Sequence, residues 1–117
     1  MGGFEVIFYQ KASGEEPAQE FILSLDNKMR AKINSMISLL EDNGTELRKP
    51  YSEHLEDGIF ELRVKFASNI SHVLYFFVSG KRIILTHGFI KKTQKTPRME
   101  IDRAKIYRDD YLNRGNN

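Results

Sequence analysis

The chain contains no cysteine, so it has neither a disulfide framework nor a thiolate metal site. This absence suits a reducing cytoplasm. No apolar run approaches the roughly 20 residues that a membrane helix needs. The N-terminus also lacks a basic segment followed by an apolar one, so we expect no membrane anchor and no secretory signal. These absences predict a cytoplasmic protein without membrane contact.

Several kinds of chemical motif are also missing. The chain has no phosphate-binding glycine loop, no nucleophile elbow and no pair of catalytic carboxylates, so we expect no cofactor. Its three histidines lack the spacing of metal ligands, and we therefore expect no metal site. We find no internal repeat or linker, and 117 residues with 40% apolar side chains predict one domain over residues 1–117.

Charge is distributed unevenly along the chain although the formal net charge is only +2. Residues 1–57 contain 6 basic and 11 acidic side chains, a net of −5, and residues 58–117 contain 12 and 5, a net of +7. A basic half is typical of a face that binds phosphate groups. A chance imbalance on a solvated surface remains the alternative.

The first half of the chain predicts one strand and two helices. Residues 4–9 are mostly apolar and aromatic and predict a strand. Pro17 suits the first turn of a helix, and Asp26 or Asn27 suits the N-cap of a second helix that ends at Asn43-Gly44. The two helices are expected to form a hairpin. The buried stripe of the second helix is expected to contain Met29, Ile33, Met36, Ile37 and Leu40.

The second half predicts three strands and a final helix. Residues 45–58 are interpreted as a loop, and strands are expected at residues 59–66, 72–78 and 81–89. Thr96 is expected to cap a C-terminal helix whose first residue is Pro97, and the weak amphipathicity of this helix predicts loose or partner-dependent docking. The order β-α-α-β-β-β-α predicts an α+β fold, an antiparallel sheet with the helices on one face.

Three charged side chains alternate along the predicted strand at residues 59–66. Glu61, Arg63 and Lys65 point to the same side, because alternate residues of a strand share a face. Arginine binds two phosphate oxygens at once through its planar fork, and a nearby carboxylate can orient it. The three residues therefore form a candidate phosphodiester clamp, with an ordinary solvated strand face as the alternative.

A second candidate is the loop after the last predicted strand. It contains Lys91, Lys92, Lys95 and Arg98 without an acidic residue, and it leads into a helix N-terminus, which attracts anions. The loop predicts contacts with an RNA backbone, although lysine-rich loops are also common on ordinary surfaces. Phe89 adjoins the loop and could stack on a base, or simply belong to the core.

The histidines are candidate proton carriers because only histidine titrates near neutral pH without help. His72 opens the central predicted strand and is the best candidate of the three. His87 is expected to share a strand face with Leu85 and Phe89, which favours a structural role. His54 falls in the predicted loop and could simply be exposed.

Two segments resemble a known family. Residues 57–64 read Asp-Gly-Ile-Phe-Glu-Leu-Arg-Val, and residues 87–97 read His-Gly-Phe-Ile-Lys-Lys-Thr-Gln-Lys-Thr-Pro. Together they resemble the phage-derived toxins of the HigB branch of the RelE/ParE toxin superfamily, and the likeness covers nearly the whole chain. The resemblance implies a RelE-like fold and a ribosome-dependent, metal-free endoribonuclease that cleaves mRNA. It also implies a partner antitoxin with a helix-turn-helix domain.

The resemblance further implies residue roles. The nucleophile would be the 2′-hydroxyl of the RNA itself. Arg63 would stabilise the charge on the phosphorane, Glu61 would orient Arg63, and Lys91 and Lys92 would hold the message or transfer protons.

The chain departs from the family pattern at two positions. His54 stands where relatives usually have lysine, and His72 stands where they usually have arginine. A lost fixed charge of this kind typically costs about 10²-fold in rate. A histidine could instead act as a general base or acid. The sequence therefore leaves open a degenerate toxin that only binds RNA or antitoxin, and a DNA gyrase inhibitor of the ParE type.

Overall fold

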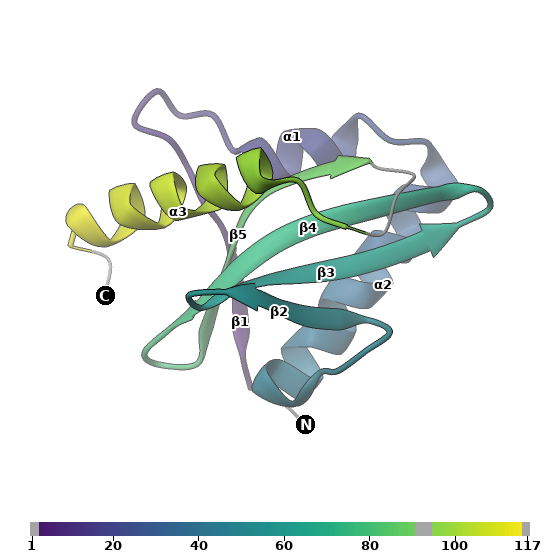
Figure 1. Cartoon of the computed structure of the whole chain (residues 1–117), viewed down its shortest axis with the longest axis horizontal. Helices are drawn as coiled ribbons and strands as arrows, with labels where there is room; N and C mark the ends of the chain where they lie inside the picture. Colours follow the sequence, from purple (N-terminus) through teal and green to yellow (C-terminus); the bar gives the residue numbers. More distant parts are fainter. Residues whose placement is uncertain (1–2, 91–94, 116–117) are drawn as a thin grey trace.

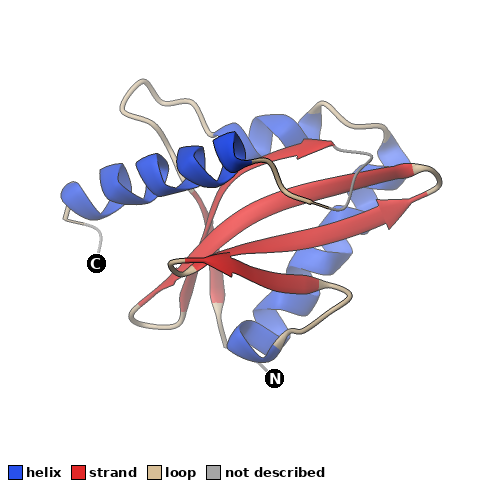
Figure 2. Ribbon diagram, in the orientation of Figure 1, coloured by secondary structure: helices blue, strands red, loops and turns tan. Residues whose placement is uncertain are grey.

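The computed structural model describes residues 3–90 and 95–115, which form a five-stranded sheet with helices on both of its faces (Figures 1 and 2). Within these residues no helix combines the length and apolar character needed to cross a membrane. The elements in chain order are β1 (Glu5–Phe8), α1 (Pro17–Leu23), α2 (Asn27–Asn43), the short 3-10 helix η1 (Gly44–Glu46), β2 (Ser52–Glu56), β3 (Ile59–Phe66), β4 (Asn69–Val78), β5 (Arg82–Ile90) and α3 (Arg98–Asn113).

The sheet is mixed, with the strand order β1-β5-β4-β3-β2. Neighbouring strands are antiparallel except β1, which pairs in parallel with β5, so the prediction of a wholly antiparallel sheet is wrong at this edge. The opposite edge strand, β2, lies inside the predicted loop at residues 45–58. It joins β3 through a tight turn in which Asp57 and Gly58 both have positive φ, at 51° and 77°, as a two-residue hairpin of the I′ kind requires.

The helices α1 and α2 cover the face that lies behind the sheet in Figure 1. As predicted, α1 begins at Pro17, the side chain of Asp26 accepts a hydrogen bond from the Met29 N–H at 2.9 Å, and α2 ends at Gly44. The buried side chains of α2 are Met29, Ile33, Ile37 and Leu40. They pack against the sheet residues Leu62, Val64, Val73, Tyr75, Ile83 and Leu85.

Helix α3 covers the other face, in front of the sheet in Figure 1, so the prediction of helices on one face is wrong. Its buried residues Ile101, Ala104 and Tyr111 explain why the helix docks despite its thin apolar stripe. The apolar sheet residues on this side are Ile59, Leu74, Phe76 and Ile84. A second face exists because β4 and β5 carry apolar side chains in both directions.

The start of α3 also differs from the prediction. Its N-cap is Pro97, and no side chain caps the helix. The hydroxyl of Thr96 instead donates a hydrogen bond to the buried carboxylate of Glu61. The predicted cap is therefore wrong, because a buried charged acceptor takes the hydroxyl.

An irregularity in β5 changes the direction of its last side chains. The register with β4 shifts between Leu74 and Tyr75, which leaves Thr86 as the extra residue of a bulge. Leu85 packs on the side of α1 and α2, whereas His87 contacts Glu100 of α3. The prediction that His87 and Leu85 share a face is therefore wrong, and the bulge is the reason.

Candidate active site

The centre of the candidate site is Arg63, which lies between two carboxylates. Its Nε and Nη2 donate to Glu61 Oε2 at 3.1 and 2.5 Å, and Nη2 also donates to Glu53 Oε1 at 2.9 Å. Glu53 on β2 pairs directly with Glu61 on β3, so the two acidic side chains emerge side by side next to Arg63. Within the described residues Nη1 has no hydrogen-bond partner, so it keeps two donors for an anion.

Glu61 is fully buried and joins three parts of the fold. Its Oε1 accepts hydrogen bonds from His72 Nδ1 at 2.9 Å and from the Thr96 hydroxyl, while Oε2 accepts from Arg63. Burial alone would raise the pKa of Glu61, but the hydrogen bonds from His72, Thr96 and Arg63 outweigh it and hold the pKa below the ordinary value. Glu61 is therefore an ionised carboxylate inside the protein, placed as an orienting partner of Arg63 would be.

His72 is also fully buried, and its ring lies parallel to that of Phe89, with the centroids 5.1 Å apart. Since Nδ1 faces the carboxylate of Glu61, the neutral ring carries its proton on Nδ1 and leaves Nε2 as an acceptor. Nε2 is buried without a hydrogen-bond partner among the described residues. The proton-carrier role predicted for His72 thus has the right tautomer but no solvent access.

A cavity of about 220 Å³ opens beside Arg63. Its polar walls include two carboxylates, the Arg63 guanidinium and Lys95, and its apolar walls come from β2 and α3. The lining residues are Glu53, Leu55, Glu61, Arg63, Lys95, Thr96 and Ile101. The cavity can therefore present fixed donors and an exposed ammonium group to an anion, whereas His72 is not part of its wall.

The remaining predicted site residues fall into three groups. Lys91 and Lys92 lie outside the described residues. Lys65 is exposed and shares with Arg63 a second hollow of about 190 Å³, which Pro50 and Ile70 complete. Phe89 is half-buried against His72, so one side of its ring is already covered.

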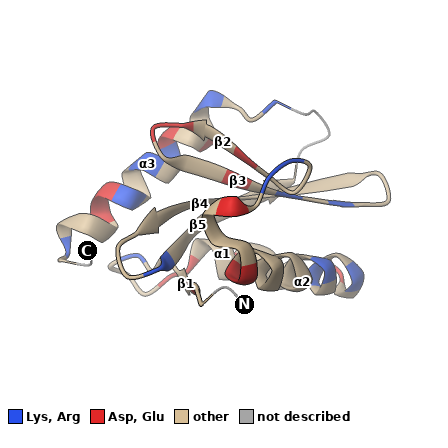
Figure 3. Cartoon of the chain, turned by 90° about the horizontal axis from the view of Figure 1, so that it is seen from below, with Lys and Arg blue, Asp and Glu red and all other residues tan. Residues whose placement is uncertain are grey.

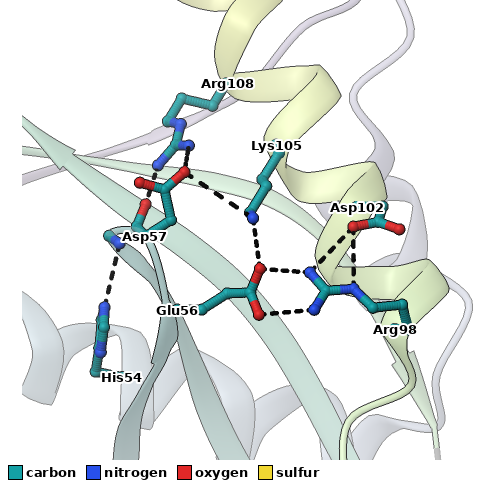
Figure 4. Close-up of polar contacts among 8 residues, drawn as sticks. His54, Glu56, Asp57, Arg98, Asp102, Lys105 and Arg108 are labelled. Carbon is teal, nitrogen blue, oxygen red and sulfur yellow. Dashed lines mark hydrogen bonds and ion pairs between the residues drawn. The ribbon is translucent and has the colours of Figure 1, made fainter.

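Arg98 belongs to an ion-pair network that fastens α3 to the turn between β2 and β3 (Figure 4). Its guanidinium contacts both oxygens of Glu56, at 2.7 and 2.5 Å, and Asp102 at 3.1 Å. Lys105 also contacts Glu56, and Arg108 binds Asp57 at 2.9 Å. The hydrogen bonds from Arg98 and Lys105 lower the pKa of Glu56 to about 2. Arg98 would have to exchange these carboxylates for a phosphate in order to bind RNA.

The basic second half of the chain does not form a bare cationic face. Figure 3 shows both signs of charge along α3 and around β2. Six of its basic side chains form ion pairs, and three of the acids involved, Glu53, Glu56 and Asp57, come from the acidic first half. The six are Arg63, Arg98, Arg103, Lys105, Arg108 and Arg114. In the described part of the chain, Lys65 and Lys95 form no ion pair and are the cations on this side left for a ligand.

Sequence reasoning missed Glu53 and misassigned Thr96. The available signal for Glu53 was Asp57-Gly58, a dipeptide typical of two-residue hairpins, which implies a strand on each side. For Thr96 the sequence offered only its place before a helix, which predicts a cap. No group of three or more metal-binding side chains gathers within residues 3–90 and 95–115.

Comparison with known proteins gives one family. The model of the family described as phage derived protein Gp49-like (DUF891) matches residues 20–108, from α1 to the last third of α3. No curated protein matches the chain. The matched segment contains β2 to β5 and every described residue of the candidate site.

Proposed function

The chain belongs to the Gp49-like family of phage-derived proteins, broadly a family of RelE- and HigB-like toxins, and on this premise we propose that it is the toxin of a toxin–antitoxin pair. The proposed activity is cleavage of mRNA on the ribosome in the cytoplasm. A neighbouring antitoxin with a helix-turn-helix domain would silence it.

The observation that carries this proposal is the fixed position of Arg63 at the mouth of the cavity. Two of its nitrogens are held by Glu61, so the side chain is oriented before any ligand arrives, and Nη1 still has donors to offer. Preorganised donors stabilise a developing charge more than mobile ones, because they need no reorganisation during the reaction. Lys95 lines the same cavity and adds a second cation.

In this mechanism the 2′-hydroxyl of the message attacks the adjacent phosphorus. Arg63 and Lys95 offset the negative charge of the phosphorane, and Lys91 and Lys92 assist from the neighbouring loop. Lys65 extends the basic track along β3. The protein needs no water molecule as nucleophile, since the RNA supplies its own.

The test compares wild-type protein with Arg63→Ala and with Lys28→Ala, which removes an exposed cation from α2 on the other side of the sheet. Purified protein is added to ribosomes translating a defined message, and the 5′ ends of the fragments are mapped. We expect wild type and Lys28→Ala to cut the message, and Arg63→Ala to cut about 10²–10³-fold more slowly.

Two results would contradict the proposal. Wild-type protein that neither arrests growth on induction nor cuts translated messages would exclude an mRNA-cleaving toxin. Accumulation of cleaved DNA–gyrase complexes with intact messages would favour the ParE type of activity instead. Binding to ribosomes without cleavage would favour the degenerate toxin that the substitution of histidine at position 72 leaves open.

A further inference from the structure

We propose that Glu53 is the general base that removes the proton from the 2′-hydroxyl of the RNA. This inference rests on the proposed function and adds a catalytic residue to it. It starts from the requirement that a proton acceptor must reach the substrate within hydrogen-bond distance.

Access to the cavity separates the candidate acceptors. The ring of His72 is fully buried and does not line the cavity. Glu61 lines it, but its side chain has no exposed surface, and three hydrogen-bond donors already surround its carboxylate. The side chain of Glu53 is 34% exposed and also lines the cavity.

The contacts of Glu53 leave room for a proton. Its Oε1 accepts one hydrogen bond from Arg63 at 2.9 Å, and its Oε2 lies 3.6 Å from Nζ of Lys49, whose side chain is 73% exposed. An ionised carboxylate offers about four acceptor positions, so further positions face the cavity. Exposed ion pairs such as that with Lys49 hold the side chain only weakly.

Arg63 fixes the distance between the phosphate and the base. Its Nη2 binds Glu53, and Nη1 on the same planar group is open within the described residues. A phosphate bound at Nη1 is therefore a direct neighbour of the Glu53 carboxylate. The 2′-hydroxyl next to that phosphorus then lies beside a proton acceptor.

The step balances with these groups alone. Glu53 takes the proton as the 2′-oxygen forms a bond to phosphorus, and the bond from phosphorus to the 5′-oxygen breaks. The 5′-oxygen takes a proton from solvent. The products are a 2′,3′-cyclic phosphate and a 5′-hydroxyl, and Glu53 returns its proton to solvent.

The test uses Glu53→Gln, which keeps the shape of the side chain and removes the charge. The matched control is Glu46→Gln, the same change at an exposed position outside the cavity. Once wild-type cleavage has been mapped, cleavage is measured under single-turnover conditions on the ribosome. Binding is measured with the same message carrying a 2′-deoxynucleotide at the cleavage position.

We expect Glu53→Gln to cleave about 10²–10⁴-fold more slowly, as loss of a general base predicts. The deoxy message should bind as tightly as to wild type or more tightly, because a negative charge beside the phosphate is gone. Glu46→Gln should match wild type in both measurements. A cyclic phosphate at the 3′ end of the fragment is also expected.

Each other result decides against the assignment. Unchanged or faster cleavage by Glu53→Gln, with tighter binding, would make Glu53 only a competitor of the phosphate and would overturn the base while the proposed function stands. No cleavage by wild type would overturn both. If Glu53→Gln fails to fold, Glu53→Asp serves instead, since its shorter carboxylate should slow cleavage without loss of binding.

Discussion

Replacement of Glu61 by glutamine tests the electrostatic centre of the molecule. Glutamine has the same shape but only one acceptor oxygen, and its amide group is a donor. The surrounding groups, Arg63, His72 and Thr96, are themselves donors, so the amide must face at least one of them. A buried donor without its acceptor costs about 1–3 kcal/mol, and a hydrogen bond to a charged group contributes about 1.5–3 kcal/mol.

These values set the size of the effect. Removing one partner of a buried ion pair typically costs about 3–5 kcal/mol. Arg63 keeps its contact with Glu53, which reduces the loss. We therefore expect Glu61→Gln to lower the free energy of unfolding at pH 7 by about 2–4 kcal/mol. With a denaturant slope of about 1–3 kcal/mol per molar urea, the midpoint should fall by about 1 M or more.

The effect should also depend on pH in one direction. The pKa of Glu61 in the folded chain lies below the ordinary value of 4.5, so the carboxylate contributes stability that is fully present above pH 4.5. This contribution is lost as the pH falls through the lower, folded-state pKa. The difference between wild type and Glu61→Gln should therefore shrink in urea titrations below pH 4.5. Glu56, whose pKa is also low, is present in both proteins and cancels in the difference.

Glu46→Gln serves as the control for the change of charge, since Glu46 is exposed. A difference between wild type and Glu61→Gln that stays constant from pH 7 to pH 3 would show that the carboxylate is not ionised in the fold. A glutamine variant as stable as wild type would show that the contacts with Arg63, His72 and Thr96 contribute nothing. Either result would refute the role of Glu61 as an ionised, orienting partner.

Two further predictions concern packing and alkaline pH. A Cβ atom at Gly88 would lie 2.3 Å from the ring of Phe21 and 3.0 Å from the carbonyl oxygen of His72, so Gly88→Ala should lose about 1–3 kcal/mol in thermal or urea unfolding, and no loss would contradict the close packing of α1 on β5. Burial raises the pKa of Tyr9 and of Tyr75 from 10.0 to about 12, so stability that is present below pH 10 should be lost as the pH rises toward 12, and two of the five tyrosines should ionise late in an absorbance titration; simultaneous ionisation of all five at pH 10 would contradict this.

The sequence predicts those elements whose signals are local. The alternation in residues 59–66 gives both ends of β3, and the Asp26 cap and Gly44 give the ends of α2. The strand β2 escaped prediction because Ser-Glu-His-Leu-Glu lacks β-branched and aromatic residues. It becomes a strand through its pairing with β3, since sheet context overrides weak propensity. The parallel pairing of β1 and the face chosen by α3 also depend on contacts between distant parts of the chain.

The candidate site follows the same division. Alternation along one strand was enough to place Glu61 and Arg63 together, and the structure has them in contact. Glu53 and Thr96 come from the edge strand and from the segment before α3, so only the folded sheet brings them to Arg63. The unequal charge of the two halves predicted a basic face. In the fold, the carboxylates of Glu53, Glu56 and Asp57 lie against basic side chains of the second half.

The charge balance of the cavity connects these findings to catalysis. Its ionised walls are two carboxylates, Glu53 and Glu61, and two cations, Arg63 and Lys95, so the resting cavity has no formal excess of positive charge. When the proton of the 2′-hydroxyl moves to Glu53, that carboxylate becomes neutral, and the cavity gains one positive charge as the phosphorane gains its negative charge. The attraction of Arg63 for the phosphate therefore strengthens in the transition state rather than in the ground state, and only such differential binding accelerates the reaction. A site built from fixed cations alone would hold the uncleaved message equally tightly and would gain less from the transfer.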